Sequence, residues 1–326
     1  YTECEFEIIL AVSIVSFLIG FPANLLALFA FSSKIHSKPH PTDILLLNLA
    51  VSDLLFLIIL PLKMHEAASG MEWTLPNFMC SITAFVFFSS IHTSTLLLTA
   101  VSVVRYVAVV HPVSYHRLQK PMSTVVVGIV IWLTSAAHCS IVFIAQHHPS
   151  RNNSHVCYKD FTEEQLRILL PVRFEAFFLL SLIPLVICFY CYTRCIVVLC
   201  SRPRISSQKK QRAIGMALGT LAVFLICVLP FSLSHLWGYA QGESPSWRDY
   251  ALLLCTLNTC IDPIISYCSS SAFRCTSRGF VLKRAAQVVP DQQRPCTTSG
   301  DECREVGKQS PESRRRVPQG TLPRSR

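Results

Sequence analysis

The segment IILAVSIVSFLIGFPANLLALFAF, residues 8–31, contains no Asp, Glu, Lys or Arg. It is longer than the roughly 20 apolar residues that a helix needs to cross a hydrocarbon layer about 30 Å thick. The segment therefore predicts a membrane-spanning helix, and six later segments are also long and apolar, with Asp53 and Asp262 as their only charged residues. They are residues 44–62, 77–104, 124–146, 176–193, 213–240 and 250–267. The sequence is predicted to form an all-α membrane protein, a bundle of seven transmembrane helices.

The composition and the distribution of charge agree with this prediction. Of the 326 residues, 51% are hydrophobic and 15% are charged, which is too apolar a composition for a soluble domain. Segments 34–42, 111–123 and 194–212 together carry ten Lys or Arg and no acid. Because basic loops favour the cytoplasmic side, we expect the N-terminus outside the cell and the C-terminus in the cytoplasm. The net charge of +10 is then expected to face anionic lipid and indicates no nucleic-acid partner.

The sequence predicts four consecutive parts. Residues 1–7 are expected to be an extracellular N-terminus, and the true start is expected upstream because the chain begins with Tyr1 and not Met. Residues 8–270 form the predicted transmembrane domain. Residues 271–287 mix apolar and basic side chains, as a short amphipathic helix on the cytoplasmic leaflet does. Residues 288–326 are polar and rich in Pro, Ser, Arg and Gln, and are expected to be a disordered cytoplasmic tail.

Two of the cysteines stand apart from those inside the apolar segments. Cys80 begins the third predicted span on the outer side, and Cys157 lies in the outer loop between the fourth and fifth spans. Because the extracellular compartment is oxidising, we predict a disulfide between them. The same loop contains the triplet NNS beginning at Asn152, a predicted acceptor of N-linked glycosylation.

Four basic side chains lie in the outer third of the predicted spans, where ionisable groups are functional candidates because lipid tolerates them only in a shared interior. Glu175 is the only span acid near them, so the surplus charge predicts an anionic ligand. A small carboxylate fits best, because guanidinium groups bind its oxygens in pairs and imidazoles add hydrogen bonds. The alternative is that the arginines pair with Glu163, Glu164 or Glu175 and the histidines are packing groups. The four candidate ligands are His138, Arg173, His235 and Arg248.

Several motifs follow one another in a characteristic order. They are GFPANLL (20–26), LNLAVSDLL (47–55), Cys80 at the start of the third span, VVRY (103–106), Trp132, Pro184, Pro230 and DPIISY (262–267). Together they resemble rhodopsin-like (class A) G-protein-coupled receptors over residues 8–284. More narrowly, ILLPVRFE (168–175), AAHCS (136–140), FSLSH (231–235) and GESPSWRDY (242–250) are similar to the free fatty acid receptors, particularly their short-chain branch. The resemblance implies a multi-pass receptor of the plasma membrane that is not an enzyme and needs no cofactor.

The resemblance also implies a ligand class and its contacts. In the family, two arginines and a histidine of the sixth span hold the carboxylate, and these match Arg173, Arg248 and His235, while His138 matches a further pocket residue. Acetate, propionate and butyrate are the implied ligands. Phe88 on the third span is predicted to close the pocket floor and favour a short tail, with ordinary helix packing as the alternative reading.

A second implied site is a buried polar cluster near mid-membrane. Its members, by match to the family, are Asn24, Asp53, Ser94, Asn258 and Asp262. Oxygen ligands suit a hard cation, so Asp53 and Ser94 are predicted sodium ligands, and sodium would be an allosteric ion that stabilises the resting state. The alternative is a purely structural polar network.

The cytoplasmic end carries the implied output switch. Arg105, Tyr192 and Tyr267 match the family's switch residues at the inner ends of the third, fifth and seventh spans. The implied cytoplasmic partners are a heterotrimeric G protein of the Gi/o or Gq type, and arrestin. Val104 stands where the family usually has Glu or Asp, so the ion pair that restrains the arginine is missing and raised basal signalling is expected.

Two other functions would also use some of these residues. A receptor for another carboxylate, such as a hydroxy acid, a dicarboxylate or a longer fatty acid, would use the same bases. An anion or proton-coupled transporter would also need intramembrane charges, but it should have a polar path through both leaflets. The bases here stop in the outer third, and this favours a receptor.

Overall fold

The computed structural model describes residues 3–37, 39–118, 120–146, 157–159, 161–203 and 205–269. Within these ranges every regular element is a helix, and seven helical segments are long and apolar enough to cross a membrane. The predicted all-α bundle of seven spans is therefore confirmed. The predicted cytoplasmic helix 271–287, the tail 288–326 and Asn152 lie outside the described residues.

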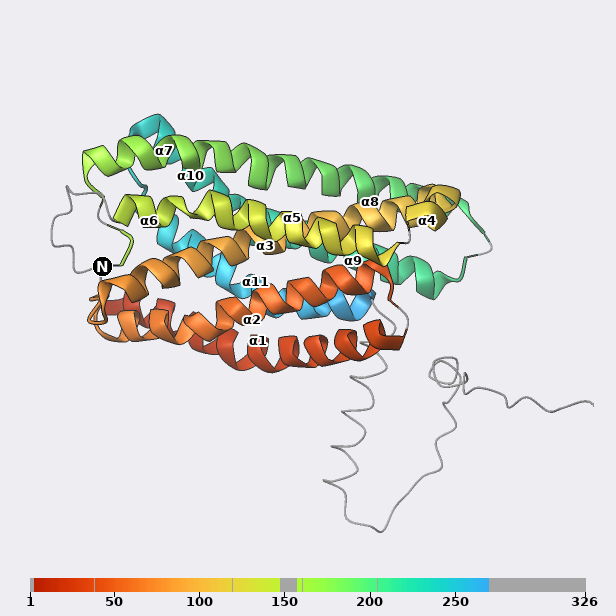
Figure 1. The fold of residues 1–326 in the computed structure, drawn as a ribbon, viewed down its shortest axis with the longest axis horizontal. Helices are drawn as coiled ribbons and strands as arrows, with labels where there is room; N and C mark the ends of the chain where they lie inside the picture. The colour runs from red at the N-terminus through yellow and green to blue at the C-terminus, as the bar shows by residue number, and fades with distance from the viewer. Residues whose placement is uncertain are drawn as a thin grey trace, which may run out of the picture. The chain divides into compact units, whose positions relative to one another are not determined.

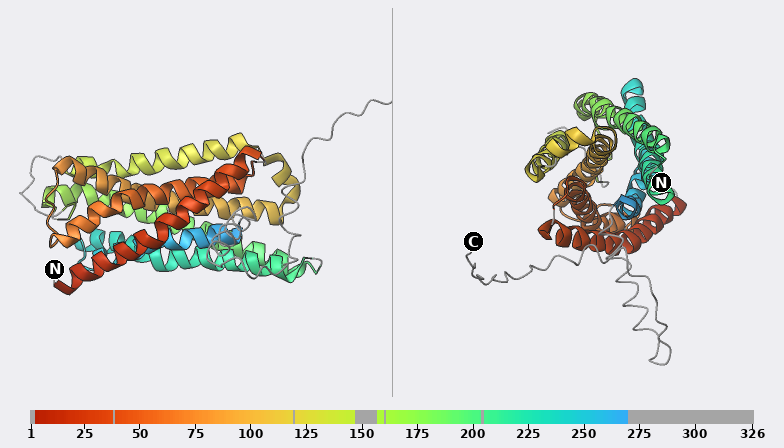
Figure 2. Two further views of the ribbon diagram at one scale, coloured as in Figure 1. Left: turned by 90° about the horizontal axis from the view of Figure 1, so that it is seen from below. Right: turned by 90° about the vertical axis from the view of Figure 1, so that its right-hand side faces the viewer.

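Seven spans are built from the helical elements, which lie side by side in Figures 1 and 2. The third span packs against the second, fourth and fifth, and the first packs between the second and the seventh. In chain order the spans are α1 (Glu3–Ser37); α2 (Pro41–Ala68); α3 (Asn77–Val110); α5 (Pro121–Cys139) with α6 (Ile141–Gln146); α7 (Glu163–Phe177), η1 (Phe178–Leu182) and α8 (Ile183–Ser201); α9 (Ser207–Ala222), η2 (Val223–Val228) and α10 (Leu229–Gln241); and α11 (Arg248–Ser269). The short helix α4 (Pro112–Leu118) lies in the connection between the third and fourth spans.

The helix ends carry recognisable start and stop signals. Pro41 and Pro121 occupy first-turn positions, where a missing N–H is tolerated. Thr162 and Gln165 form a capping box at the start of α7. Gly242 ends α10 with a φ of 77°, a left-handed conformation that glycine adopts without steric cost. These signals mark where individual helices begin and end. We call the end of the bundle that contains Cys80 the disulfide end and the opposite end the Arg105 end.

Apolar side chains cover the outer surface of the bundle and also fill its core. Leu18, Phe29 and Leu133 are each more than 60% exposed, as lipid-facing residues are. Inside, one apolar cluster lies toward the Arg105 end and includes Tyr192 and Phe224. A second cluster, nearer the disulfide end, is formed by Phe56, Leu57, Leu60, Phe87, Ile91, Phe231, Ala251 and Cys255.

The helices extend further than the apolar segments that predict them. The first begins at Glu3, inside the expected extracellular segment 1–7, and the fifth span begins at Glu163, well before residue 176. A helix satisfies its own backbone hydrogen bonds, so it can continue past the hydrocarbon boundary into a polar environment. The longer fifth span is important for function, because it carries Arg173 on a rigid helix.

Candidate functional site

A small cavity lies near the disulfide end among α3, α5, α7, α10 and α11. Its volume is about 30 Å³. All four predicted carboxylate ligands line it, together with Phe88, and we call it the arginine cavity. The four are His138, Arg173, His235 and Arg248. Spans four to seven therefore bring their basic groups to one place, as the sequence predicts.

Arg173 projects from α7 into this cavity and is only 6% exposed. Its Nη1 donates a hydrogen bond to Ser244 Oγ at 2.8 Å. The guanidinium carbon also lies 5.2 Å from the ring centre of Phe161 and 5.9 Å from that of Tyr158. Among the described residues, the ion pairs do not include Arg173. Its charge is therefore held by a hydroxyl and two aromatic rings.

Arg248 reaches the same cavity from the first turn of α11 and is 7% exposed. Its Nη1 donates to Ser234 Oγ at 2.8 Å, and its guanidinium lies 4.6 Å from the ring centre of Phe231. In the described part of the chain it too has no ion-pair partner. A buried charge without a counterion is costly, so the cavity with both guanidiniums favours an anion.

His235 on α10 is oriented by Arg248. Its Nδ1 lies 3.4 Å from Arg248 Nη1. Because a guanidinium can only donate, Nδ1 must accept, which leaves Nε2 as the protonated nitrogen of the neutral ring. Nε2 is buried and has no hydrogen-bond partner in the described part of the protein. The ring is thus positioned to donate to a further oxygen.

Two further histidines form another wall of the cavity. The ring of His138 lies edge-on to that of His92, with centres 5.7 Å apart. His92 is 7% exposed, and its Nδ1 lies 3.3 Å from Cys139 Sγ. The sequence prediction omits His92 as a ligand, although it lies one helical turn from Phe88 and so on the same face of α3. The four-residue spacing between Phe88 and His92 could have identified His92 as a pocket residue.

Phe88 makes contacts of two kinds. Its ring lines the arginine cavity and also packs against other aromatic side chains. Its centre lies 6.0 Å from that of Phe231, in a stacked arrangement, and 5.3 Å from that of Tyr158. Arg248 lies 5.9 Å from the Phe88 ring centre. The side chain thus forms a wall of the cavity and helps to surround the guanidinium.

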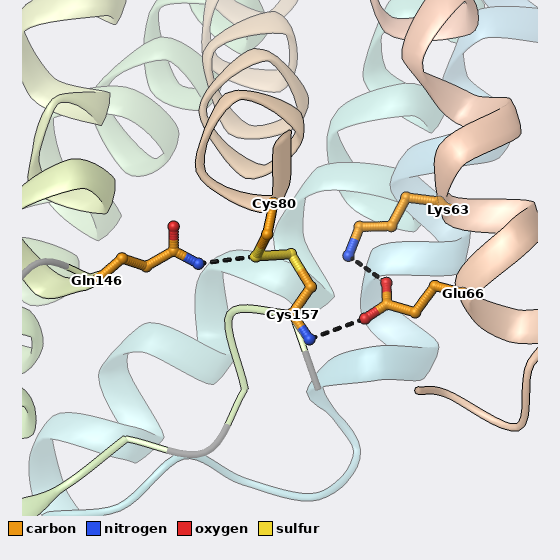
Figure 3. Close-up of polar contacts among 5 residues, drawn as sticks. All are labelled: Lys63, Glu66, Cys80, Gln146 and Cys157. Carbon is orange, nitrogen blue, oxygen red and sulfur yellow. Dashed lines mark hydrogen bonds and ion pairs between the residues drawn. A yellow bond between two sulfur atoms is a disulfide. The ribbon is translucent and has the colours of Figure 1, made fainter. Parts of the chain in front are cut away.

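The loop beside the cavity is anchored at Cys157, as Figure 3 shows. The predicted disulfide is present, joining Cys80 of α3 to Cys157. The backbone N–H of Cys157 donates to Glu66 Oε1 at 2.9 Å, and Glu66 Oε2 pairs with Lys63 Nζ at 2.8 Å. Gln146 Nε2 lies 2.8 Å from Cys80 Sγ. The loop is therefore tied covalently to α3 and by a buried carboxylate to α2.

Tyr158 follows this anchor and contributes to the arginine cavity. Its backbone φ of 58° is left-handed, which is uncommon for an aromatic residue. Burial raises the pKa of the Tyr158 phenol above its usual value, while the nearby guanidiniums of Arg173 and Arg248 act in the opposite direction. The phenol is therefore neutral at physiological pH and keeps its O–H. Sequence reasoning missed Tyr158 because its position depends on the path of the loop.

The predicted polar cluster is assembled in the middle of the bundle. Ser94 Oγ donates to Asp53 Oδ1 at 3.3 Å, and Asn258 Nδ2 donates to Asp262 Oδ2 at 2.9 Å. The carboxyl groups of Asp53 and Asp262 are close enough to interact electrostatically. The remaining oxygens, Asp53 Oδ2, Asn258 Oδ1 and Asp262 Oδ1, are buried and receive no donor from the described residues.

Asn24 has a different role from the other predicted members of this cluster. Its Nδ2 donates to the backbone carbonyls of Gly20 at 3.0 Å and Thr259 at 2.9 Å. It thereby ties α1 to α11 beside the cluster. The oxygen-rich donor set that remains, two carboxylates with a hydroxyl and an amide oxygen, is one that a hard cation such as sodium prefers.

The three predicted switch residues lie toward the Arg105 end. Tyr192 is 1% exposed, and its hydroxyl lies 3.2 Å from Thr220 Oγ1 of α9. Arg105 is within electrostatic range of Tyr192. Tyr267 and Val104 pack against the apolar cluster at this end. Val104 makes an apolar contact there, and Arg105 is also within electrostatic range of Asp43.

Comparison with known proteins identifies the chain's relatives. The model of the 7 transmembrane receptor (rhodopsin family) matches residues 23–266. The free fatty acid receptor 3 of Mus musculus is 43% identical over 284 residues, which cover 86% of this chain and 88% of the relative. The human protein of the same name is 42% identical over 271 residues, covering 82% of this chain and 78% of the relative. The free fatty acid receptor 2 of Homo sapiens is 41% identical over 292 residues, covering 88% and 87%.

These relatives are receptors and not enzymes, and they match this chain across nearly all of its spans. The family match and the seven apolar helices indicate a multi-pass protein of the plasma membrane. The chain belongs to the rhodopsin family of G-protein-coupled receptors and, within it, to the free fatty acid receptors.

Proposed function

We propose that this protein is a cell-surface receptor for short-chain fatty acids such as acetate, propionate and butyrate, and that it signals through heterotrimeric G proteins. Arg173 and Arg248 bind the carboxylate, and His235 donates a hydrogen bond to it through Nε2. His138 lines the same pocket. The names of the relatives, which are free fatty acid receptors, support the ligand class.

The observation that carries this proposal is the chemistry of the arginine cavity. Two buried guanidiniums share a cavity of about 30 Å³, and neither has a carboxylate partner among the described residues. His235 adds a buried nitrogen without a partner in the same part of the protein. A carboxylate would supply the missing negative charge and the acceptors at once. The small volume favours an acid with a short tail.

The orientation and the output follow from the same proposal. The Cys80–Cys157 disulfide belongs in an oxidising compartment, so the disulfide end faces outside and the Arg105 end faces the cytoplasm. If the carboxylate binds the active conformation more tightly than the resting one, it shifts the outer ends of spans five to seven toward the active conformation. Repacking at the Arg105 end then admits a Gα subunit of the Gi/o or Gq type, and arrestin after it.

Sodium is part of this proposal as an allosteric ion at Asp53 and Ser94. The buried oxygens of Asp53, Asn258 and Asp262 that lack donors among the described residues support it. Sodium chloride is expected to lower the potency of propionate several-fold, because the ion stabilises the resting state. N-methylglucamine chloride at equal ionic strength is the control. The idea fails if both salts act equally, or if Asp53→Asn keeps the sodium effect.

The ligand class is tested by one dose–response series. Unbranched carboxylic acids of one to twelve carbons are applied to cells that express the wild-type receptor, and G-protein activation is read. We expect potency to peak among the short acids and to fall as the tail outgrows the cavity. Equal potency at all lengths would exclude the short-chain assignment. A peak with hydroxy acids, dicarboxylates or long acids would instead establish another carboxylate as the ligand.

Val104 provides a test of the output end. Restoring the acid with Val104→Glu should lower ligand-free signalling at equal surface expression, by about fivefold if the new ion pair with Arg105 contributes about 1 kcal/mol. Val104→Gln introduces a side chain of the same shape as glutamate but without its charge, so it should change basal signalling much less. Equal basal activity in the wild type and Val104→Glu would show that another contact already restrains Arg105.

A further inference from the structure

A second cavity lies next to the arginine cavity, on its α1–α2 side. It has a volume of about 100 Å³, against about 30 Å³ for the arginine cavity. Much of its wall is apolar and comes from α2, α3 and α11, including Leu60, Phe87 and Leu252. We call it the annex cavity. The charged side chains at its edge are already paired, Lys63 with Glu66 and Lys159 with Asp249.

Two aromatic side chains separate the cavities. Phe88 and Tyr158 are the residues that line both of them. Their ring centres are 5.3 Å apart, so they stand together as one partition. The partition has the guanidiniums of Arg173 and Arg248 on one side and the apolar annex on the other. A hydrocarbon tail that starts from the arginines meets these rings before it reaches the annex.

The two halves of the partition are held very differently. Phe88 lies within the long helix α3, packed against Phe87 and Phe231. Tyr158 lies in a loop, where its left-handed backbone follows directly on the anchored Cys157. Such a conformation persists only when its surroundings impose it. The anchors are the disulfide and the hydrogen bond from Cys157 to Glu66, both drawn in Figure 3.

We propose that the ring of Tyr158 is the partition element that sets the limit on tail length, and that the annex cavity binds the tail of longer unbranched carboxylates once this ring is removed. This inference rests on the proposed function, because it takes the carboxylate to be held by Arg173 and Arg248. Each methylene that enters an apolar cavity raises affinity about fourfold. Longer acids would therefore gain affinity by placing their tails in the annex cavity, and in the wild type the Tyr158 ring prevents this.

The test compares three variants at matched surface expression. Tyr158→Ala removes the ring, Tyr158→Leu removes it but keeps an apolar side chain, and Tyr158→Phe keeps the ring as the matched control. G-protein activation is measured for propionate and hexanoate. We expect the potency of hexanoate relative to propionate to rise about tenfold or more in the alanine and leucine variants. The phenylalanine variant should keep the wild-type ratio within about twofold.

A fourth variant shows whether the annex itself takes the tail. Ala84 of α3 lines the annex and not the arginine cavity. In the Tyr158→Ala background, Ala84→Leu should fill the annex and return the hexanoate-to-propionate ratio toward the wild-type value. A general loosening of the loop would leave the ratio raised.

The outcomes separate this inference from the proposed function. If the wild type answers propionate and the ratio is unchanged in both Tyr158→Ala and Tyr158→Leu, the partition is overturned and the receptor assignment stands. If Tyr158→Phe changes the ratio as much as Tyr158→Ala, the phenol hydroxyl and not the ring is responsible. If the wild type answers no carboxylate, the proposed function itself is wrong.

Discussion

Arg248→Ala is expected to abolish most of the response to propionate without lowering the thermal stability of the ligand-free receptor. Truncating one partner of a buried, hydrogen-bonded charge pair costs about 2–5 kcal/mol, so potency should fall by about 30-fold or more. In the ligand-free protein the same guanidinium is 7% exposed and lacks a carboxylate partner among the described residues. Removing such a charge relieves a desolvation cost, so the melting temperature should stay the same or rise.

The matched control for this prediction is Arg167→Ala. Arg167 lies on α7, the helix that carries Arg173, but its side chain is exposed and lines a different surface hollow. We expect its removal to leave propionate potency within about twofold of the wild type, because an exposed charge far from the carboxylate is screened by solvent. If Arg248→Ala destabilised the ligand-free receptor and kept its potency, Arg248 would be a structural residue.

Removing the disulfide by Cys157→Ser should have the second large effect. The bond joins residues separated by 77 positions, and the loss of such a cross-link typically costs about 2–4 kcal/mol. It also releases the loop that carries Tyr158 beside Arg173. We therefore expect a lower melting temperature together with a strong loss of propionate potency.

Cys200→Ser is the appropriate control, since Cys200 is an exposed free thiol on α8. It should behave like the wild type in both measurements, thermal unfolding of the purified receptor and dose–response in cells. A Cys157→Ser variant with wild-type potency would mean that the loop holds its position through the Glu66 contact alone.

The sequence is sufficient to predict the spans and the four basic residues of the arginine cavity for one physical reason. Charged groups are so costly in lipid that His138, Arg173, His235 and Arg248 stand out against apolar surroundings. Their meeting in one cavity follows from seven helices packed side by side, of which the fourth to the seventh each carry a base near the same end. Successive spans cross the membrane in opposite directions, so the distance of each base from the end of its span gives its depth in the bundle.

The limits of the helices were harder to predict. The apolar segment begins at residue 176, but the helix of the fifth span begins at Glu163, because a helix can continue through charged residues such as Arg173 beyond the apolar segment. The capping box formed by Thr162 and Gln165 was a readable signal for the true start.

The role of Asn24 was also not predictable. Its side chain donates to backbone carbonyls, a role that its match to the family pattern does not specify.

Tyr158 could not be predicted from sequence patterns. Its position depends on a disulfide, on the buried carboxylate of Glu66 and on a left-handed backbone, and these act together only in three dimensions. No periodicity marks a single loop residue as a pocket wall. The partition between the two cavities is therefore a property of the folded chain.

The most direct test of the carboxylate site is the thermal stabilisation of purified receptor in nanodiscs by propionate and by propionamide. The amide has nearly the same shape as the acid but carries no charge, so it cannot neutralise Arg173 and Arg248. Propionate should raise the melting temperature of the wild type in a saturable manner, propionamide should not, and Arg248→Ala should lose the effect. Equal stabilisation by the amide, or full stabilisation of Arg248→Ala by propionate, would contradict the account.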